Sequence, residues 1–354
     1  MKVLFVYQFA TLGGVESVLR SRLEGLPAFG VDAHVWFLAD SGGLGTFDGF
    51  RDRVHVGGPQ PLMAFVADLD PDVIASIDTE EVLRLPFEVK SALIAECHSP
   101  YFENLGYLSR LDGQLVRVVL VPSAHQRETV ERKIRHAIPV RVVPNPVGEA
   151  FLCENIQLRE IPSRPILAWI GRLDALKDWE AFLEIGSLVC STHEAQLWVV
   201  GDTSEPSAAR RLYRVAKEKR VLSSLSWLRA VPYSDMPSVL ATVKASGGLV
   251  VSTSRNESFG MGVAEAMACS NVVIAPRIGP FEELISDGVT GFLYDRKSPA
   301  AAAQIAGALL ADSSLRSRSG GAARQGVMGR YSPTSALPVL VDELRVALTG
   351  HRSY

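Results

Sequence analysis

The feature that most constrains the fold is an alternation of short apolar runs with helical patterns. The first run, at residues 3–6, has the continuous apolar character of a central parallel strand that is buried on both faces. In the first part of the chain, similar runs recur at residues 33–38, 54–56, 73–77, 92–95, 116–121 and 140–143. Strands that alternate with helices in this way form βαβ units, so the sequence predicts a parallel sheet.

One interruption of this alternation indicates a boundary between two domains. The segment at residues 144–165 is polar and proline-containing, which is typical of a linker. After it, strand-like runs return at residues 166–170, 197–200, 225–228, 248–251, 272–275 and 291–293, with helical patterns at 178–189, 205–219, 234–242 and 299–310. We predict an α/β fold of two Rossmann-like, doubly wound domains, residues 1–150 and 151–330, that face each other across a cleft. A helical tail, residues 331–354, shows no pattern that indicates where it packs.

The composition argues against several classes of protein. Of the 354 residues, 47% are hydrophobic and 21% are charged, as in a globular protein with a substantial core. The formal net charge of −3 argues against a nucleic-acid partner, and no uncharged apolar stretch reaches the length of about 18 residues that suggests a membrane span. The histidines lack ligand-like spacing, so we expect no metal site. Scattered cysteines predict reduced thiols in a cytoplasmic protein; they are Cys97, Cys153, Cys190 and Cys269.

The segment at residues 252–268 carries the strongest indication of a ligand site. It follows a strand-like run and leads into small and apolar residues that suit a packed helix. Gly260 and Gly262 would let the backbone approach a ligand closely, at a helix start whose N–H groups attract an anion. Glu257 and Glu265 flank this position and would bind hydroxyls rather than phosphates. A ligand with hydroxyls at both ends and a diphosphate between them is a nucleotide sugar.

Two cations follow the strand-like run at residues 166–170. Arg172 and Lys177 lie on the loop at the carboxyl end of that strand, where ligands of open parallel sheets bind. Arginine offers a fork of donors and lysine a point charge, and both suit a diphosphate. The alternative is that these side chains pair with Asp174 and Asp178 at the surface.

The first domain offers two weaker indications of a site. Gly13 and Gly14 precede the helical pattern at residues 15–26, as expected where a ligand approaches a helix N-terminus, although a simple tight turn is the alternative. The motif G-x-G-x-x-G is missing there, so dinucleotide binding is not indicated. His98 follows the strand-like run at residues 92–95 and could bind a sugar or a phosphate, or polarise a reacting group; the alternative is a structural histidine.

Two carboxylate patterns invite interpretations that we do not adopt. The D-x-D formed by Asp68 and Asp70 precedes the run at residues 73–77, which is the amino end of a strand and the wrong edge for a ligand. Glu257 and Glu265 also invite a glycosidase interpretation, which needs two carboxyls about 5–9.5 Å apart. Eight residues of mostly helical rise span about 12 Å, so we expect two hydroxyl-binding residues rather than an acid and base.

Several motifs of the chain match one known pattern. Glu257 and Glu265 form an E-x₇-E pair, and the other matching motifs are G-R-L-D-A-L-K at 171–177, G-G-V-E at 13–16 and D-G-V-T-G-F-L at 287–293. Through them the chain resembles the family 4 retaining glycosyltransferases of the GT-B fold, over nearly its whole length and most specifically at residues 165–295. It departs from the family at residues 279–282, where many members carry a glycine pair, and at Asp178, where a glycine often follows the lysine.

The resemblance implies a role for each matching residue of the second domain. Glu265 would bind the ribose hydroxyls, and Glu257 would bind the hydroxyls of the donor sugar. Arg172 and Lys177 would bind the diphosphate. Backbone N–H groups at the sugar–phosphate would come from Phe259, Gly260, Met261 and Gly262.

The residues of the first domain receive roles in the same way. Gly13 and Gly14 would close on the phosphate or the reacting centre, and His98 would lie near the donor sugar. Arg172, Lys177, Glu257 and His98 are thus the residues that the resemblance assigns to catalysis.

The implied reaction moves a sugar from a nucleotide-diphosphate donor to a hydroxyl- or amine-bearing acceptor, with retention at the anomeric carbon. No cofactor and no essential metal are expected. The acceptor is an unidentified small molecule, glycan or lipid-linked molecule; membrane contact is not favoured, because acidic residues are interspersed with the basic ones of segment 127–141. Two alternatives remain, namely a non-hydrolysing nucleotide-sugar epimerase and a nucleotide-sugar-binding module.

Overall fold

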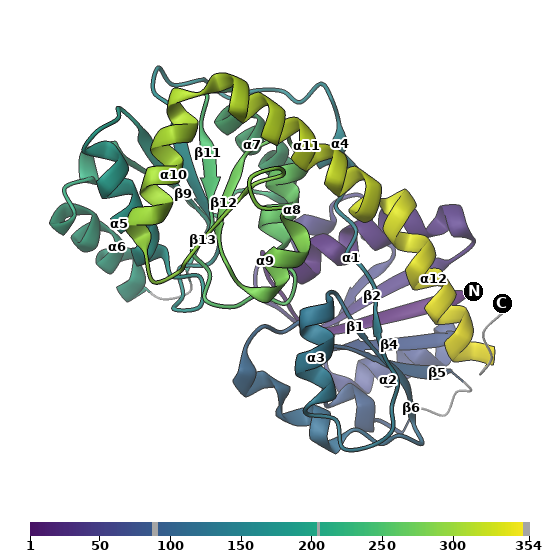
Figure 1. Ribbon diagram of the computed structural model, residues 1–354. Coiled ribbons are helices and arrows are strands. Elements are labelled where there is room, and N and C mark those ends of the chain that lie inside the picture. Colours follow the sequence, from purple (N-terminus) through teal and green to yellow (C-terminus); the bar gives the residue numbers. More distant parts are fainter. Residues whose placement is uncertain (87–90, 204–205, 350–354) are drawn as a thin grey trace. The chain divides into compact units, whose positions relative to one another are not determined.

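Two parallel sheets organise the chain, as shown by a computed structural model that describes residues 1–86, 91–203 and 206–349 (Figure 1). The described residues divide into two compact units. Of these residues, the first unit contains those within 1–148 together with 330–349, and the second contains those within 149–329. The parallel sheets confirm the predicted α/β, doubly wound architecture.

The first unit is built on a seven-stranded sheet with the strand order β3-β2-β1-β4-β5-β6-β7. All neighbouring strands run parallel, and the order reverses next to β1, as in a doubly wound fold. The strands are β1 (Lys2–Ala10), β2 (Asp32–Asp40), β3 (Val54–Val56), β4 (Val73–Ile77), β5 (Ala92–Glu96), β6 (Val116–Val121) and β7 (Val140–Val142). The helices of this unit are α1 (Gly14–Gly25), α2 (Pro59–Leu69), α3 (Ala124–Glu131) and α12 (Pro333–Thr349), with 3₁₀ turns η1 (Leu26–Phe29), η2 (Leu44–Phe47), η3 (Val82–Arg84) and η4 (Phe102–Arg110).

The apolar run at the start of the chain is buried because both faces of β1 are covered. Val3 and Phe5 belong to the cluster that packs against α1 and α12, whereas Leu4 and Val6 belong to the cluster on the α2 side. Alternate side chains of a strand point to opposite faces, so a strand covered on both sides must be apolar at every position.

The tail that carried no packing signal forms α12 and packs on the first unit. It contacts α1, β4 and β5 (Figure 1). Its residues Leu337, Leu340 and Leu344 are buried in the core of that unit. The chain returns to the first unit through α11 (Ser313–Tyr331), a helix that the glycine- and serine-rich sequence does not indicate. One of its glycines has a packing reason, because a Cβ on Gly320 would lie 2.3 Å from the carbonyl oxygen of Ser270.

The second unit is built on a six-stranded parallel sheet with the order β10-β9-β8-β11-β12-β13. Its strands are β8 (Ile166–Ile170), β9 (Gln196–Val200), β10 (Leu225–Leu228), β11 (Leu249–Val251), β12 (Val273–Pro276) and β13 (Phe292–Tyr294). Its helices are α4 (Glu149–Leu152), α5 (Trp179–Cys190), α6 (Pro206–Glu218), α7 (Met236–Ala245), α8 (Met261–Ala268), α9 (Gly279–Leu284), α10 (Pro299–Ala311) and most of α11, with 3₁₀ turns η5 (Leu222–Ser224) and η6 (Tyr233–Asp235). The neighbours β8 and β11 place the loops that follow them side by side at one edge of the sheet.

Candidate active site

The start of helix α8 is the centre of the candidate site in the second unit. Gly260 is the N-cap residue and has a φ of 100°, in the left-handed region that glycine adopts without strain. A Cβ at this position would lie 2.5 Å from Cε1 of Phe281, so the backbone also approaches that ring too closely for another residue. Met261 and Gly262 open the first turn, and their backbone N–H groups belong to the positive end of the helix.

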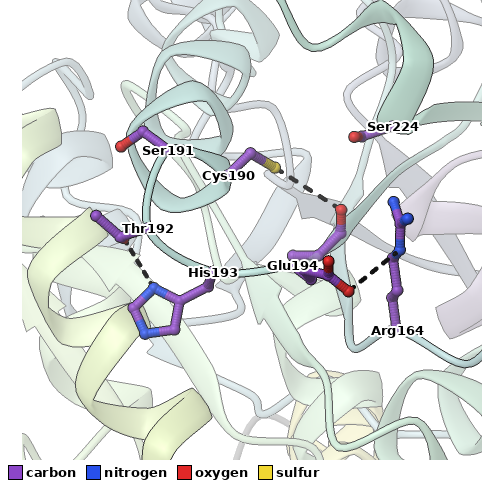
Figure 2. Close-up of a pocket in the computed structure, with 8 residues that line it drawn as sticks. Arg164, Cys190, Ser191, Thr192, His193, Glu194 and Ser224 are labelled. Carbon is purple, nitrogen blue, oxygen red and sulfur yellow. Dashed lines mark hydrogen bonds and ion pairs between the residues drawn. The ribbon is translucent and has the colours of Figure 1, made fainter.

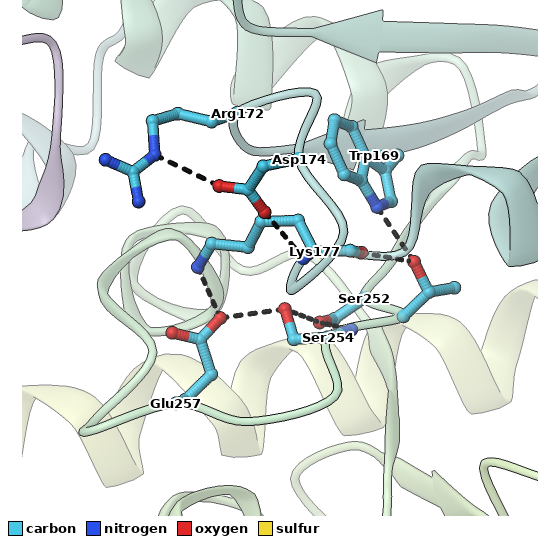
Figure 3. Close-up of polar contacts among 8 residues, drawn as sticks. Trp169, Arg172, Asp174, Lys177, Ser252, Ser254 and Glu257 are labelled. Atoms are coloured by element: carbon cyan, nitrogen blue, oxygen red, sulfur yellow. Dashed lines mark hydrogen bonds and ion pairs between the residues drawn. The ribbon is translucent and has the colours of Figure 1, made fainter. Parts of the chain in front are cut away.

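A lysine and a glutamate meet directly beside this helix start. The Lys177 ammonium donates a hydrogen bond of 2.5 Å to Oε1 of Glu257, and the same oxygen accepts one of 2.8 Å from the Ser254 hydroxyl (Figure 3). The Lys177 side chain is 21% exposed and that of Glu257 10%. The pair is therefore partly open to solvent, and a bound anion could compete with Glu257 for the lysine.

The loop after β8 places the second cation. Arg172 Nε lies 3.4 Å from Oδ2 of Asp174, and half of the arginine side chain is exposed (Figure 3). Oδ1 of Asp174 accepts the backbone N–H of Lys177 at 2.9 Å, whereas Asp178 pairs with Arg255 at 2.8 Å. The alternative prediction, in which these cations pair with neighbouring aspartates at the surface, thus holds for Arg172 but not for the ammonium of Lys177.

Two residues that sequence reasoning missed hold the lysine loop against the loop of Glu257. The Thr253 hydroxyl accepts a hydrogen bond from Nε1 of Trp169. It also lies 2.9 Å from the backbone carbonyl oxygens of Lys177 and Asp178, and it can donate its hydrogen bond to either of them. Thr253 immediately follows Ser252 at the end of a buried strand, and hydroxyl residues there would have been the signal to follow. These contacts bring Lys177 and Glu257 together across 80 residues of sequence.

Two further residues that the sequence predicts to bind the donor are buried around α8. Glu265 lies inside the helix and is only 6% exposed, and Phe259 is 3% exposed. Burial, reinforced by the negative charge of Glu265, raises the pKa of the neighbouring Cys269 thiol to about 12.

In the first unit, the glycine pair begins helix α1 and packs against a buried carboxylate. Gly13 is the N-cap and Gly14 the first helical residue. Oε1 of Glu16 accepts the backbone N–H of Thr11 at 2.5 Å and the Thr11 hydroxyl at 2.6 Å. A Cβ on Gly13 would lie 2.9 Å from Oε2 of Glu16, so close packing is one reason for glycine here.

His98 lies just beyond the carboxyl end of β5 and is buried. Its Nε2 is 2.9 Å from Oε2 of Glu96, and its backbone N–H donates to Oδ2 of Asp78 at 2.9 Å. Glu96 also forms a fork of two 2.9 Å hydrogen bonds with Arg22. Burial would raise the pKa of Glu96, but the charge of Arg22 and the hydrogen bond from His98 outweigh burial and lower this pKa to about 2. Burial raises the pKa of Asp78, only partly offset by His98.

A separate cavity of about 300 Å³ lies elsewhere in the second unit (Figure 2). Its lining includes Arg164, which precedes β8, and His193 and Glu194, which precede β9. It therefore opens at the amino ends of the strands, opposite the edge where Lys177 and Glu257 lie. The cavity is not part of the candidate site.

The part of the chain that contains this site is similar to a known protein family. Residues 154–326 match the family model described as Glycosyl transferases group 1. The matched segment makes up just under half of the chain. It contains Arg172, Lys177, Glu257 and Glu265 together with the start of α8, whereas Gly13, Gly14 and His98 lie outside the matched residues.

Curated relatives match about half of this chain and less than half of their own length. The D-inositol 3-phosphate glycosyltransferase of Segniliparus rotundus is 30% identical over 192 residues, which are 53% of this chain and 41% of that protein. The enzyme of the same name from Xylanimonas cellulosilytica is 34% identical over 161 residues, or 45% of this chain and 37% of that protein. The matches thus span less than half the length of these relatives.

Solved structures match nearly the whole chain. Anabaena HepE, crystallised in complex with UDP and glucose, has a TM-score of 0.82 at 21% identity and covers 98% of this chain and 99% of its own. The sucrose-phosphate synthase of Thermosynechococcus elongatus has a TM-score of 0.77 at 16% identity and covers 99% and 100%. At these identities the likeness shows the fold alone, and it confirms the predicted GT-B fold.

Proposed function

We propose that the chain is a retaining glycosyltransferase of the family 4 type. It would transfer a hexosyl group from a nucleoside diphosphate sugar to a hydroxyl- or amine-bearing acceptor. The observation that carries this proposal is the Lys177–Glu257 pair at the start of α8, inside the segment that matches the Glycosyl transferases group 1 model. This arrangement puts a cation, helix N–H groups and a hydroxyl-binding carboxylate within one small region.

The charges of the site suit a departing diphosphate. In the proposal, the diphosphate binds Lys177, Arg172 and the N–H groups of Met261 and Gly262, and Glu257 binds the sugar hydroxyls. Preorganised donors of this kind stabilise the negative charge that grows on a leaving group. No side chain is assigned as a nucleophile, and the leaving phosphate itself would help to deprotonate the acceptor on the same face of the sugar.

Other residues complete the proposed donor site. Glu265 would bind the ribose hydroxyls, with Phe259 and Gly260 shaping the backbone around the sugar–phosphate. From the first unit, His98 would hydrogen-bond a sugar hydroxyl, and Gly13 and Gly14 would approach the phosphate or reacting centre.

The choice of probe follows from a structural neighbour. Anabaena HepE was crystallised with UDP and glucose, so UDP-glucose is the first donor to test. The acceptor, whether a small molecule, a glycan or a lipid-linked molecule, is not specified by the site. Among the described residues, no helix combines the length and the apolar character needed to cross a membrane. The unpaired thiols of all four cysteines suit the reducing cytoplasm, where we place the activity.

Two linked measurements test the proposal. Thermal-shift screening against a panel of nucleotides and nucleotide sugars should identify the donor, because a ligand at 100 times its Kd stabilises by about 2.7 kcal/mol. Release of UDP should then require an acceptor, and the product should keep the anomeric configuration of the donor sugar. Conversion of the donor without acceptor would instead identify an epimerase, and binding without turnover under any acceptor would identify a binding module.

We also propose that turnover needs no divalent metal. Arg172, Lys177 and the positive end of α8 supply the charge that a metal ion supplies in other phosphate sites. Activity should therefore persist in excess EDTA. Loss of activity in EDTA with recovery on adding Mg²⁺ or Mn²⁺ would contradict this part of the proposal.

A further inference from the structure

A buried chain of three side chains leads from helix α1 to His98. Arg22 Nη1 and Nη2 donate one hydrogen bond each to Oε1 and Oε2 of Glu96, both at 2.9 Å. The second of these oxygens also lies 2.9 Å from Nε2 of His98. Side chains of Arg22 and Glu96 are each 1% exposed and that of His98 is 6% exposed, so water does not compete with these contacts.

The ionisation of Glu96 decides whether Glu96 or His98 carries the hydrogen of the contact between them. A forked pair with a guanidinium is the geometry of an ionised carboxylate, and the pKa of about 2 agrees with it. An ionised carboxylate can only accept hydrogen bonds. The hydrogen between His98 and Glu96 must then belong to Nε2 of the imidazole ring.

We propose that Glu96 and Arg22 are positioning residues that hold His98 as the tautomer with its hydrogen on Nε2. Nδ1 is then the ring nitrogen that can accept a hydrogen bond. Resting on the proposed function, this nitrogen accepts a hydrogen bond from a substrate hydroxyl. The hydrogen bond at one ring nitrogen commonly sets what the other nitrogen can do.

The backbone of His98 is held from a second direction. Asp78 lies directly after β4 with a φ of 44°, and its Oδ2 accepts the His98 N–H at 2.9 Å. Its Oδ1 lies 3.3 Å from the Tyr107 hydroxyl. With the main chain fixed by Asp78 and the ring fixed by Glu96, little freedom remains in the direction that Nδ1 faces.

Arg22 adds a link to the glycine pair. It lies on α1, whose first turn contains Gly14, and its guanidinium packs 4.9 Å from the centre of the Phe5 ring. One buried ion pair thus fixes both the helix that begins at the glycines and the ring of His98. A hydrophobic pair could stabilise the core equally well, but it could not set a tautomer.

The test reads the ring nitrogens directly. The full chain labelled with ¹⁵N-histidine is examined by long-range ¹H–¹⁵N correlation at roughly pH 8, above the ordinary histidine pKa of about 6.5. The His98 signals are assigned by their loss in His98→Gln. We expect the Nε2–H tautomer in the wild-type chain, and a loss of this preference in Glu96→Gln, whose amide can donate to Nε2.

A matched control separates this effect from the loss of any carboxylate. Glu80→Gln removes a carboxylate that pairs with Arg84 and Arg110 at the surface of the same unit, and the His98 signals should not change. A dominant Nδ1–H tautomer in the wild-type chain would overturn the proposal, as would an unchanged tautomer in folded Glu96→Gln. If that variant does not fold, the wild-type spectrum alone decides.

Turnover provides the second readout once a donor is known. Glu96→Gln should lower kcat roughly tenfold with little change in the KM for the donor, as expected when one hydrogen bond in the reacting complex is lost. An unchanged kcat in folded Glu96→Gln would show that Nδ1 has no role in the reaction. If no nucleotide sugar is turned over at all, the proposed function fails while the spectrum still reports on the tautomer.

Discussion

The two units each contain a Glu paired with a cation near a candidate site, and the two pairs differ in kind. Arg22 and Glu96 share two parallel hydrogen bonds and are each 1% exposed. Lys177 and Glu257 share one contact and are 21% and 10% exposed. The first pair is a buried, bidentate contact of a guanidinium, whereas the second is a single contact of an ammonium group that solvent can reach.

The difference indicates what each pair is suited to do. A fully buried pair cannot exchange partners without leaving an uncompensated charge in the core, so it holds neighbouring groups in place. A partly exposed lysine can leave its carboxylate for a phosphate at small cost, because solvent screens both charges in the meantime. We therefore expect Arg22 and Glu96 to act on stability and position, and Lys177 and Glu257 to act on ligands.

The largest expected effect is on stability, in Arg22→Met. The substitution leaves Glu96 buried without its main partner, and removing one member of a buried pair costs about 3–5 kcal/mol. Urea denaturation of the full chain should show this loss in the unfolding of the first unit. In Arg22→Met/Glu96→Leu most of the stability should return, and a loss below about 1 kcal/mol in the single variant would mean that the pair is not the buried contact described here.

Acid should weaken the same pair. The pKa of Glu96 is lowered from an ordinary 4.5 to about 2, so its ionised form stabilises the fold above pH 4.5, and this contribution disappears as the pH falls toward 2. Stability measured between these two values should fall more steeply in the wild-type chain than in the Arg22→Met/Glu96→Leu variant. Equal slopes would show that folding does not lower the pKa of Glu96.

For Lys177 and Glu257, the partly exposed or open pair, the large effect should be on turnover. Lys177→Ala should lower kcat roughly 10²–10³-fold, the usual loss for one preorganised donor at a developing negative charge. The melting temperature should fall less than in Arg22→Met, because the pair is partly open to solvent and Ser254 still donates a hydrogen bond to Glu257. Lys219→Ala, which removes a 3.4 Å surface pair with Glu184 in the same unit, is the control and should keep wild-type turnover. Wild-type kcat in Lys177→Ala would refute the role of the lysine.

The backbone at the start of α8, beside the open pair, should tolerate substitution poorly, even though the open pair itself can exchange partners. Gly260→Ala places a Cβ at a φ of 100° and 2.5 Å from Phe281, which should cost about 1–3 kcal/mol. At Gly262, two residues later, the nearest side-chain atom would be 3.6 Å away, so Gly262→Ala should leave stability unchanged. Chemical denaturation of both variants compares them, and equal stabilities would show that the helix start can relax.

The smallest effect is expected at the other buried carboxylate of the first unit. The pKa of Asp78 is raised by burial, so its ionised form is unfavourable in the fold at neutral pH. Asp78→Asn keeps an oxygen for the His98 N–H and removes the charge. Stability at pH 7 should stay within about 1 kcal/mol of wild type or increase. A large loss would show that charge at Asp78, as well as at Glu96, is needed to hold the His98 loop.

Local pattern was enough to predict the elements that carry the site. Apolar runs of four to six residues became strands because a parallel strand covered on both faces excludes polar side chains, as at Val3 and Leu4 in β1. Gly260 was identified from its place between a strand and a helix. The helix α11 was missed, because glycine and serine have low helix propensity, and the close contact of Gly320 with the distant Ser270 backbone cannot be read from local sequence.

Partner choice was not available from local pattern. The sequence placed Lys177 beside Asp174 and Asp178, its neighbours along the chain, yet its ammonium bonds to Glu257, 80 residues away. In the sequence, Arg22 is an ordinary charged residue of an amphipathic helix, and Glu96 is a charged residue at the end of a strand. Neither pattern indicates that the two side chains pair. Their pairing across 74 residues follows from the packing of α1 against the sheet.

The sequence by itself therefore determined which segments are strands, loops and helix starts, because these depend on the periodicity and turn chemistry of nearby residues. Only the tertiary structure decided which charges meet, because the strand order brings distant loops to one edge of each sheet. It also decided how deeply each pair is buried. That depth separates a fixed pair from an exchangeable one, since the energy of a charge depends on its access to water.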